Sequence, residues 1–311
     1  MSGPMMWDAP AGFRSGFACF VGRPNAGKST LTNALIGQKI AITSSRPQTT
    51  RHAIRGILHR PEAQLIVIDT PGLHKPRTLL GSRLNDVVRE TWAEVDVNGF
   101  CVPADVPVGR GDEFIVNELR NVAQRTPVIG VVTKTDLAEP EQIVARLTEL
   151  SALMEFAEIV PCSARDDYQT SLVADLLVAR LPEGPPLYPD GELTDEPEET
   201  LVAELIREAA LEGVRDELPH SIAVVIEEMA PREGRHPKAE PMLDVMAHIY
   251  VERSSQKGIV IGKGGERLRQ VGTDSRRQIE ALLGTKVFLD LHVKIAKDWQ
   301  RDPRQLRKLG F

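Results

Sequence analysis

A glycine-rich octapeptide near the start of the chain has the residue types needed to hold a phosphate group. Residues 22–29 read GRPNAGKS, which fits the pattern G-x-x-x-x-G-K-[ST]. Gly22 and Gly27 allow a backbone whose N–H groups point into one anion-sized hollow at a helix start. Lys28 can reach the outer phosphates of a nucleotide, and the Ser29 hydroxyl can coordinate Mg²⁺. The octapeptide therefore predicts a nucleotide phosphate site.

Three further polar segments follow strand-like runs downstream. Asp69–Gly72 (DTPG) ends the run QLIVI, so its Asp can hold the Mg²⁺ shell and its Gly N–H can approach a γ-phosphate. Thr133–Asp136 (TKTD) ends in a carboxylate that can accept two hydrogen bonds from guanine, while its Lys lies across the base. In Cys162–Arg165 (CSAR) the Ala N–H can meet guanine O6. Together the segments favour guanine over adenine.

The stretches that position these segments alternate between strand-like and helix-like patterns. Such a rhythm indicates an α/β domain with a mostly parallel sheet covered on both faces. We expect this domain at residues 15–182, after a tail at 1–14. Its strands are expected near 17–22, 53–59, 64–70, 97–105, 127–136 and 158–164.

The rest of the chain predicts a second, smaller domain. Residues 183–200 are rich in Pro, Gly and acidic side chains, which is typical of an exposed linker. Residues 201–311 then read as helix, two strands, two helices and strand, followed by a short basic helix. This order indicates an α+β domain.

The net charge of −6 hides an uneven distribution. Residues 251–311 hold 14 Lys or Arg and 7 Asp or Glu, a balance of +7, whereas residues 183–217 hold 12 acidic and 2 basic residues. This asymmetry indicates either a polyanion partner at the basic end or a solvated basic face.

Composition excludes several classes of protein. With 41% hydrophobic and 26% charged residues, the chain is typical of a globular protein and not of a disordered one. No apolar run approaches the ~18 residues of a membrane span, and no leader sequence for secretion is evident. The three cysteines are widely spaced, which argues against a disulfide framework or a cysteine zinc site. We expect a cytoplasmic, monomeric protein.

The motifs together resemble the translation-factor-related class of GTPases. They are GRPNAGKST (22–30), PQTTRH (47–52), DTPGL (69–73), TKTD and CSAR. With the tail segments 261–280 and 287–311 added, residues 15–311 closely resemble the bacterial Era family. The resemblance implies a P-loop GTPase domain followed by a bacterial-type KH domain. It also implies binding of GTP or GDP with Mg²⁺, slow GTP hydrolysis, binding to the 3′ region of 16S rRNA and a role in assembling the small (30S) ribosomal subunit.

Several residues take roles from this resemblance. Thr50, with Thr49 as a rival, matches the switch threonine that meets Mg²⁺ and the γ-phosphate. Leu73 stands where related proteins place a water-orienting glutamine, so intrinsic hydrolysis should be slow. Asn25 resembles a residue that helps to hold K⁺, or it only braces its loop. Thr133 replaces the family's usual Asn, which should weaken guanine binding by ~0.5–3 kcal/mol.

The G-x-x-G sequence Gly262–Gly265 resembles the KH loop that lets an RNA backbone approach closely. Nearby basic residues would supply phosphate contacts and salt dependence. The expected RNA contacts are Lys257, Gly262, Lys263, Gly264, Gly265, Arg267, Arg269, Arg276 and Arg277. The six basic residues of segment 294–308 would extend this RNA surface or bind the cytoplasmic face of the inner membrane peripherally.

Three groups of residues make up the expected nucleotide site. Lys28, Thr50 and Gly72 are expected to serve catalysis, and Ser29, Thr50 and Asp69 to hold Mg²⁺. The expected nucleotide contacts are Gly22, Arg23, Pro24, Asn25, Ala26, Gly27, Lys28, Ser29, Thr30, Asp69, Thr70, Pro71, Gly72, Leu73, Thr133, Lys134, Thr135, Asp136, Ser163, Ala164 and Arg165.

The sequence leaves other functions open, two of them with the greatest weight. One is a non-catalytic RNA-binding scaffold that bound nucleotide only stabilises, and Leu73 and Thr133 favour it. The other is a GTPase of the related tRNA-modification type, which should carry a different C-terminal region. An ATPase is a further reading, because Thr133 departs from the usual guanine motif.

Overall fold

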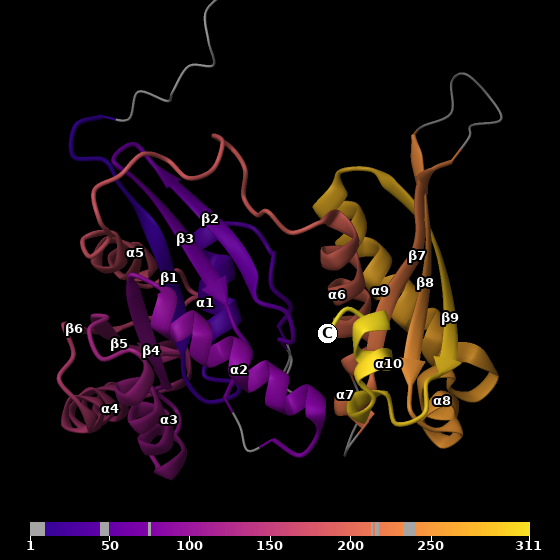
Figure 1. Cartoon of the computed structure of the whole chain (residues 1–311), viewed down its shortest axis with the longest axis horizontal. Helices are drawn as coiled ribbons and strands as arrows, with labels where there is room; N and C mark the ends of the chain where they lie inside the picture. Colours follow the sequence, from indigo (N-terminus) through magenta and orange to yellow (C-terminus); the bar gives the residue numbers. More distant parts are fainter. Residues whose placement is uncertain (1–9, 44–49, 74–75, 213, 215–217, 233–240) are drawn as a thin grey trace, which may run out of the picture. The chain divides into compact units, whose positions relative to one another are not determined.

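The computed structural model describes residues 10–43, 50–73, 76–212, 214, 218–232 and 241–311. The chain divides into two compact units (Figure 1). The first is formed mainly by residues up to Asp195 and the second mainly by residues from Glu196 onward. Among the described residues, no helix is both long and apolar enough to cross a membrane.

The first unit is built on a six-stranded sheet with strand order β2-β3-β1-β4-β5-β6. Strand β2 is antiparallel to β3, and the other neighbours are parallel. The predicted mostly parallel α/β sheet is therefore confirmed. The strands are β1 (Arg14–Val21), β2 (Ile54–Arg60), β3 (Ala63–Asp69), β4 (Val97–Pro103), β5 (Val128–Thr133) and β6 (Glu158–Pro161).

Helices follow most of these strands and surround the sheet (Figure 1). Strands β4 and β5 are buried at every residue, which explains why their sequences are almost continuously apolar. The helices are α1 (Lys28–Ile36), α2 (Leu79–Glu94), α3 (Arg110–Val122), the short 3₁₀ helix η1 (Thr135–Leu137), α4 (Pro140–Leu153) and α5 (Thr170–Val178).

Asn98 and Gly99 interrupt the apolar run of β4, and packing accounts for both. The Asn98 side chain is fully buried, where its amide donates to the Trp92 carbonyl (3.2 Å) and its Oδ1 accepts from the Cys19 thiol (3.1 Å). A Cβ at Gly99 would lie 2.6 Å from the Phe20 ring. The first residue thus joins three elements by hydrogen bonds, and the second leaves room for an aromatic ring.

Part of the predicted linker lies along the edge of the sheet. The Ile57 N–H of β2 donates to the Leu193 carbonyl (2.9 Å). The fully buried Gln64 of β3 accepts from the N–H groups of Leu187 (2.6 Å) and Tyr188 (2.9 Å) and donates to the Tyr188 carbonyl (2.8 Å). Because β2 is an edge strand, this segment supplies partners that its backbone would otherwise lack. We call residues 187–195 the strap.

The second unit contains a three-stranded sheet with strand order β7-β8-β9. Strands β7 and β8 are antiparallel, whereas β8 and β9 are parallel. The predicted order of helix, two strands, two helices and strand is confirmed, with a one-turn helix α7 added after α6. The elements are α6 (Glu198–Leu211), α7 (Leu218–Ser221), β7 (Ala223–Pro231), β8 (Met242–Val251), α8 (Ser254–Ile261), the 3₁₀ turn η2 (Lys263–Gly265), α9 (Glu266–Leu283), β9 (Lys286–Ile295), the 3₁₀ turn η3 (Trp299–Arg301) and α10 (Pro303–Lys308).

Candidate nucleotide site and nucleic-acid groove

The four segments predicted to bind a nucleotide all lie at the carboxyl ends of strands in the six-stranded sheet. The glycine-rich loop follows β1, DTPG begins at the end of β3, TKTD begins at the end of β5 and CSAR follows β6. These strands run parallel, so their carboxyl ends share one edge of the sheet. Open α/β sheets bind ligands at this edge.

The glycine-rich loop, which we call the phosphate loop (residues 22–27), depends on its glycines. Gly27 has φ 88° and caps the start of α1 in the left-handed conformation. A Cβ at Gly22 would lie 2.5 Å from the Cys101 carbonyl oxygen of β4. Asn25 also has a positive φ of 63°, which is uncommon for a residue with a side chain. The loop thus has the tight curvature that directs backbone N–H groups toward an anion.

The Lys28 ammonium group is bound by carbonyl groups of the phosphate loop itself. Its Nζ donates to the carbonyls of Gly22 (3.1 Å) and Arg23 (3.0 Å). Burial lowers the pKa of Lys28, and the Asp69 carboxylate acts in the opposite direction. The ammonium group therefore lies at the loop and can share its hydrogens with phosphate oxygens.

Three side chains expected to hold Mg²⁺ converge beside the loop. Ser29 Oγ donates to Asp69 Oδ2 (2.7 Å), and Thr50 Oγ1 donates to the same oxygen (3.1 Å). The two hydroxyl oxygens lie 3.1 Å apart. Two hydroxyls and a carboxylate are the hard oxygen ligands that Mg²⁺ prefers. The three residues thus fit Mg²⁺. Of the two candidate switch threonines, Thr50 lies beside Ser29 and Asp69, and Thr49 lies outside the described residues.

The DTPG segment passes close to the phosphate loop. A Cβ at Gly72 would lie 3.3 Å from both the backbone nitrogen and Cγ of Pro24, so glycine permits this approach. Leu73 is buried in the hydrophobic core with Val21 and Val102. At Leu73 the chain therefore presents an apolar side chain that packs inward and cannot orient a water molecule.

A cavity of about 180 Å³ lies where the guanine base is expected. Ser163 Oγ donates to Asp136 Oδ1 (2.8 Å) and thereby orients the carboxylate expected to read the base. Lys134 has a left-handed φ of 57°, which ends β5 and begins η1. The lining residues are Gly27, Thr30, Leu31, Thr133, Lys134, Asp136, Leu137, Cys162, Ala164 and Arg165.

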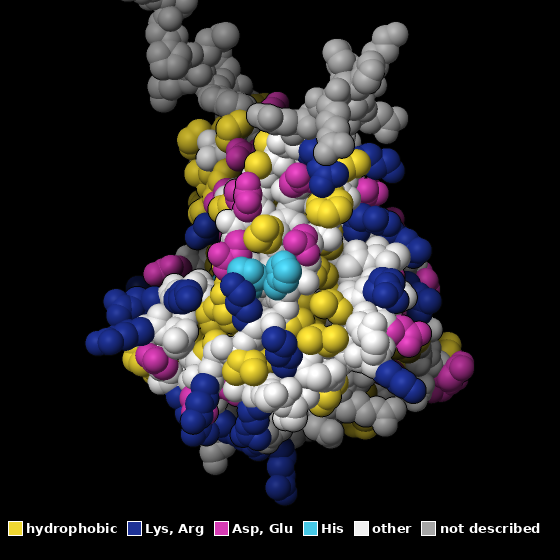
Figure 2. Space-filling view, turned by 90° about the vertical axis from the view of Figure 1, so that its right-hand side faces the viewer, with side chains coloured by type: hydrophobic (Ala, Val, Ile, Leu, Met, Phe, Trp, Pro, Cys, Tyr) yellow, Lys and Arg dark blue, Asp and Glu magenta, His cyan; other side chains and the backbone are white. Residues whose placement is uncertain are grey.

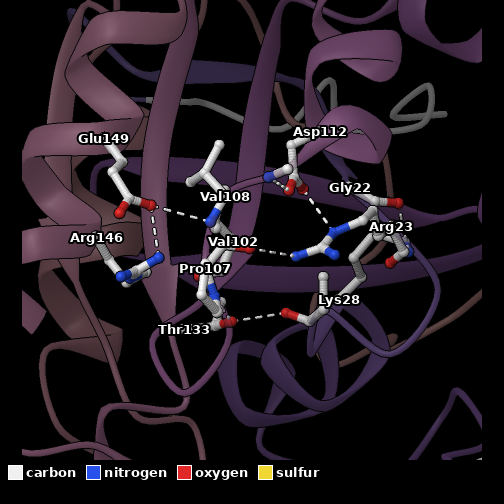
Figure 3. Close-up of polar contacts among 12 residues, drawn as sticks. Gly22, Arg23, Lys28, Val102, Pro107, Val108, Asp112, Thr133, Arg146 and Glu149 are labelled. Atoms are coloured by element: carbon white, nitrogen blue, oxygen red, sulfur yellow. Dashed lines mark hydrogen bonds and ion pairs between the residues drawn. The ribbon is translucent and has the colours of Figure 1, made fainter. Parts of the chain in front are cut away.

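Thr133 retains one contact that joins the two halves of the nucleotide site. Its buried hydroxyl lies 2.7 Å from the Ala26 carbonyl, to which it donates, and 3.4 Å from the Val102 carbonyl (Figure 3). The single hydroxyl hydrogen is therefore committed to the phosphate loop. Cys162 also lines the cavity, and burial raises the pKa of its thiol to about 12.

The G-x-x-G segment of the second unit forms a tight turn between α8 and α9. Gly262, Gly264 and Gly265 have positive φ values of 74°, 59° and 78°. A Cβ at Gly262 would lie 2.6 Å from the Arg267 Cβ. Glycine is therefore required by backbone conformation at three positions and by space at the first.

Beside this turn, a groove of about 330 Å³ runs between α9 and β9. Its apolar side chains are leucines, and the predicted RNA contacts Arg269 and Arg276 stand on the helix side. An apolar floor with basic margins can hold unstacked bases and their phosphates. The lining residues are Gly265, Leu268, Arg269, Gly272, Thr273, Arg276, Leu289 and Leu291.

The remaining predicted RNA contacts lie in different surroundings. The Arg267 Nη2 donates to the carbonyls of Ala210 (3.3 Å) and Glu212 (2.5 Å), so its guanidinium binds the end of α6. Burial lowers the pKa of Arg267. Arg277 is exposed, 3.9 Å from Asp274, and does not line the groove. Figure 2 shows Lys and Arg side chains on one face, both around its margins and below the histidines near its centre.

Sequence reasoning missed the contacts that fix these residues in place. It placed Ser163 at the nucleotide but not as the partner of Asp136, and it did not find Asp112, whose carboxylate binds Arg23 (2.8 Å). These partners lie 27 and 89 residues apart in the chain. Only the capping pattern at the start of α3, with an Asp at its third position, offered a local signal.

Two family models match the chain. A model described as a 50S ribosome-binding GTPase matches residues 17–134, and a KH domain model matches residues 217–300. The GTPase Era of Streptomyces coelicolor is 67% identical over 303 residues, covering 96% of this chain and 95% of the relative. The GTPase Era of Mycolicibacterium smegmatis is 66% identical over 300 residues, covering 96% and 99%.

Two solved structures are similar along nearly the whole chain. One is a crystal structure of Era in complex with MgGDPNP and nucleotides 1506–1542 of 16S ribosomal RNA, and the other is Aquifex aeolicus Era Y63A bound to GDP·AlF₄⁻. Each is 36% identical, has a TM-score of 0.89 and covers 96% of this chain and 99% of the solved chain. With a nucleotide site and a KH groove in one chain and relatives of this identity over its length, the protein belongs to the GTPase Era family.

Proposed function

We propose that this GTPase binds GTP with Mg²⁺, binds the 3′ region of 16S rRNA and assists assembly of the small ribosomal subunit in the cytoplasm. The observation that carries the proposal is the presence of both sites in one chain, namely the converging Ser29, Thr50 and Asp69 side chains and the basic groove beside the G-x-x-G turn. The solved Era complex with MgGDPNP and a 16S rRNA fragment supports it. We also propose that the protein is a monomer and that the basic segment 294–308 associates peripherally with the membrane, which is tested separately below.

The chain stabilises the transferring phosphoryl group mainly by electrostatics. Amides of the phosphate loop and the Lys28 ammonium group face the phosphates, where negative charge spreads in the transition state. Mg²⁺, when bound, neutralises further charge on the β- and γ-phosphates. Asp136, oriented by Ser163, holds the base and so fixes the other end of the nucleotide.

Intrinsic hydrolysis should be slow, because nothing at Leu73 positions the attacking water. Its apolar side chain is 4% exposed and packs in the core. In GTPases the residue that orients water and an arginine finger together contribute several orders of magnitude in rate. A slow cycle suits a protein whose bound state lasts while an RNA step is completed.

We further propose that the strap couples nucleotide state to RNA binding. Thr50 lies four residues before the first residue of β2, and it shares the Asp69 oxygen with Ser29. Strand β2 in turn binds the strap through Ile57, and the strap continues in the chain into α6 of the second unit. A shift of Thr50 on loss of the γ-phosphate would thus reach the RNA-binding unit through covalently connected, hydrogen-bonded elements.

A single-turnover assay separates this function from a non-catalytic scaffold, which the burial of Leu73 favours. The parent chain and Lys28→Ala are mixed with radiolabelled GTP and Mg²⁺, and phosphate release is followed. We expect hydrolysis by the parent to exceed that of the variant by at least about 100-fold, since a transition-state cation is lost. Equal rates would favour the scaffold.

RNA crosslinking in cells tests the partner. We expect crosslinks between peptides from α8 to β9 and the 3′ end of 16S rRNA. Crosslinks confined to tRNA would contradict the proposed partner, and recovery of the chain with the membrane fraction after RNase treatment would support the membrane association.

A further inference from the structure

We propose that Arg23 and Asp112 are positioning residues for GTP hydrolysis, and that their ion pair holds the phosphate loop in the shape that binds the phosphate tail. The inference rests on the chain's GTPase activity. It gives the Arg23 side chain a role distinct from nucleotide contact, and it gives α3 a part in the site.

The pair is built around a fully buried carboxylate. Arg23 Nε donates to Asp112 Oδ1 at 2.8 Å, and the Asp112 side chain is 0% exposed against 28% for Arg23. The other carboxylate oxygen, Oδ2, accepts from the Gly109 N–H (3.0 Å) at the start of α3. Asp112 therefore fixes the helix start and the phosphate loop at once (Figure 3).

The surroundings leave space for this contact. A Cβ at Gly111 would lie 2.9 Å from the Arg23 Cδ, so the absence of a side chain there admits the arginine stem. The Arg23 Nη2 also lies 3.4 Å from the Pro107 carbonyl. The Pro107 carbonyl, the open space at Gly111 and the Asp112 carboxylate thus all accommodate the Arg23 side chain.

The loop that carries Pro107 is itself anchored to a second helix. The Val108 N–H donates to Glu149 Oε2 (3.0 Å) on α4, and Arg146 binds the same oxygen (2.5 Å) (Figure 3). The receiving side of the Arg23 contact is therefore held from both α3 and α4, which makes it a rigid support.

The contact acts on the part of the loop that meets the phosphates. The Arg23 carbonyl accepts from Lys28 Nζ (3.0 Å), so a shift of the Arg23 backbone alters one of the two hydrogen bonds that hold the ammonium group. The far end of the loop is held separately, through the hydroxyl of Thr133 and the Ala26 carbonyl. Without the ion pair the near end is held less firmly, and misplacing a positioning group by about 1 Å can cost ~100-fold in rate.

The test measures GDP dissociation and GTP hydrolysis in four variants, Arg23→Ala, Arg23→Lys, Asp112→Asn and the double variant Arg23→Ala with Asp112→Asn. Losing a charge-assisted hydrogen bond to a buried partner should speed GDP dissociation about tenfold or more in Arg23→Ala and lower kcat/KM similarly. Asp112→Asn should behave alike, and Arg23→Lys should recover part of the loss. Because the residues act as a pair, the double variant should be no worse than the poorer single variant.

Arg89→Ala is the matched control. Arg89 also binds a carboxylate on α3, through Nη2 to Glu118 (2.9 Å), but the pair does not touch the phosphate loop. We expect Arg89→Ala to leave GDP dissociation unchanged. If it speeds dissociation as much as Arg23→Ala does, general loosening of α3 is the cause and the proposal is overturned.

A second readout locates the effect within the site. ITP lacks the guanine amino group read by Asp136, so the ratio of GTP to ITP affinity reports the base cavity. We expect Arg23→Ala to weaken the binding of both nucleotides by the same factor and to leave this ratio unchanged.

A parent-like GDP dissociation rate in folded Arg23→Ala overturns only this inference, whereas a parent chain that binds no guanine nucleotide overturns the nucleotide function itself. Far-UV circular dichroism confirms folding, and Arg23→Lys keeps the test decisive if Arg23→Ala does not fold.

Discussion

At the scale of single residues, the nucleotide site is explained by which side chains already bind one another. Lys28 binds carbonyls of its own loop, Ser29 and Thr50 share an oxygen of Asp69, and Ser163 holds Asp136. Each polar group therefore has its geometry set before a nucleotide arrives, which lowers the cost of ordering it on binding.

Thr133→Val replaces the hydroxyl by a methyl group of similar volume and so tests the contact between β5 and the phosphate loop. The buried hydrogen bond to the Ala26 carbonyl (2.7 Å) is lost. We expect GDP affinity to fall by about two- to tenfold, equivalent to ~0.5–1.5 kcal/mol. Isothermal titration calorimetry measures this change. Thr133→Ser, which keeps the hydroxyl, is the control and should bind GDP as the parent does; a Val variant of parent-like affinity would show that the contact is unimportant.

Asn25, with its left-handed backbone in the phosphate loop, carries a prediction about monovalent ions. If Asn25 helps to hold K⁺ near the phosphates, turnover should be faster in K⁺ than in Na⁺ at equal ionic strength, because the cation supplies charge that an arginine finger supplies in other GTPases. Asn25→Ala should remove the difference. Equal turnover in the two salts would mean that Asn25 only braces the loop.

At the scale of elements, local motifs could be predicted and the contacts between them could not. The phosphate loop, DTPG, TKTD and the G-x-x-G turn are each a single short run of consecutive residues, so the local sequence is enough to predict their chemistry. By contrast, the Arg23–Asp112 pair, the Gln64 contacts and the Phe20 ring above Gly99 join residues 79 to 124 positions apart. Arg267 follows the G-x-x-G turn, a sequence context typical of a phosphate contact. Only the position of α6 reveals that its guanidinium binds backbone carbonyls.

The strap can be released by a substitution in β3. Gln64→Leu removes three hydrogen bonds to residues Leu187 and Tyr188, and we expect limited proteolysis within residues 183–195 to become at least several-fold faster. Arg55→Ala is the control, because it removes only a half-exposed ion pair with Asp195 (3.2 Å). Equal protease sensitivity of Gln64→Leu and the parent would mean that the strap is held elsewhere.

Salt dependence distinguishes the groove from the general basic surface. Arg276 lines the groove, whereas Arg277, its neighbour in the chain, is 74% exposed and lies outside it. We expect Arg276→Ala to weaken binding of a 3′-terminal 16S rRNA fragment and to reduce the slope of log K against log salt by about one. Arg277→Ala should change both quantities less. Fluorescence anisotropy across a series of KCl concentrations gives the two slopes; a larger effect at Arg277 would place the RNA elsewhere.

At the scale of the whole molecule, the function depends on two sites that one chain connects. The first unit holds the groups suited to a guanine nucleotide and Mg²⁺, and the second holds the glycine turn and the basic groove. The strap lies along β2, the strand that follows Thr50 in the chain, and continues into α6. The sequence correctly predicted the order of the two domains but not the strap, because Pro- and acid-rich composition looks like a free linker whether or not a sheet edge is available to it.

The most direct test is to titrate a labelled 3′-terminal fragment of 16S rRNA with the full chain at fixed salt, with Mg²⁺ and a non-hydrolysable GTP analogue, with Mg²⁺ and GDP, and without nucleotide. Coupling through the strap predicts that RNA affinity differs between the two nucleotide states by about fivefold or more, the range of allosteric coupling energies. It also predicts that Gln64→Leu reduces this difference while both ligands still bind. Identical RNA affinities in all three conditions would contradict the account.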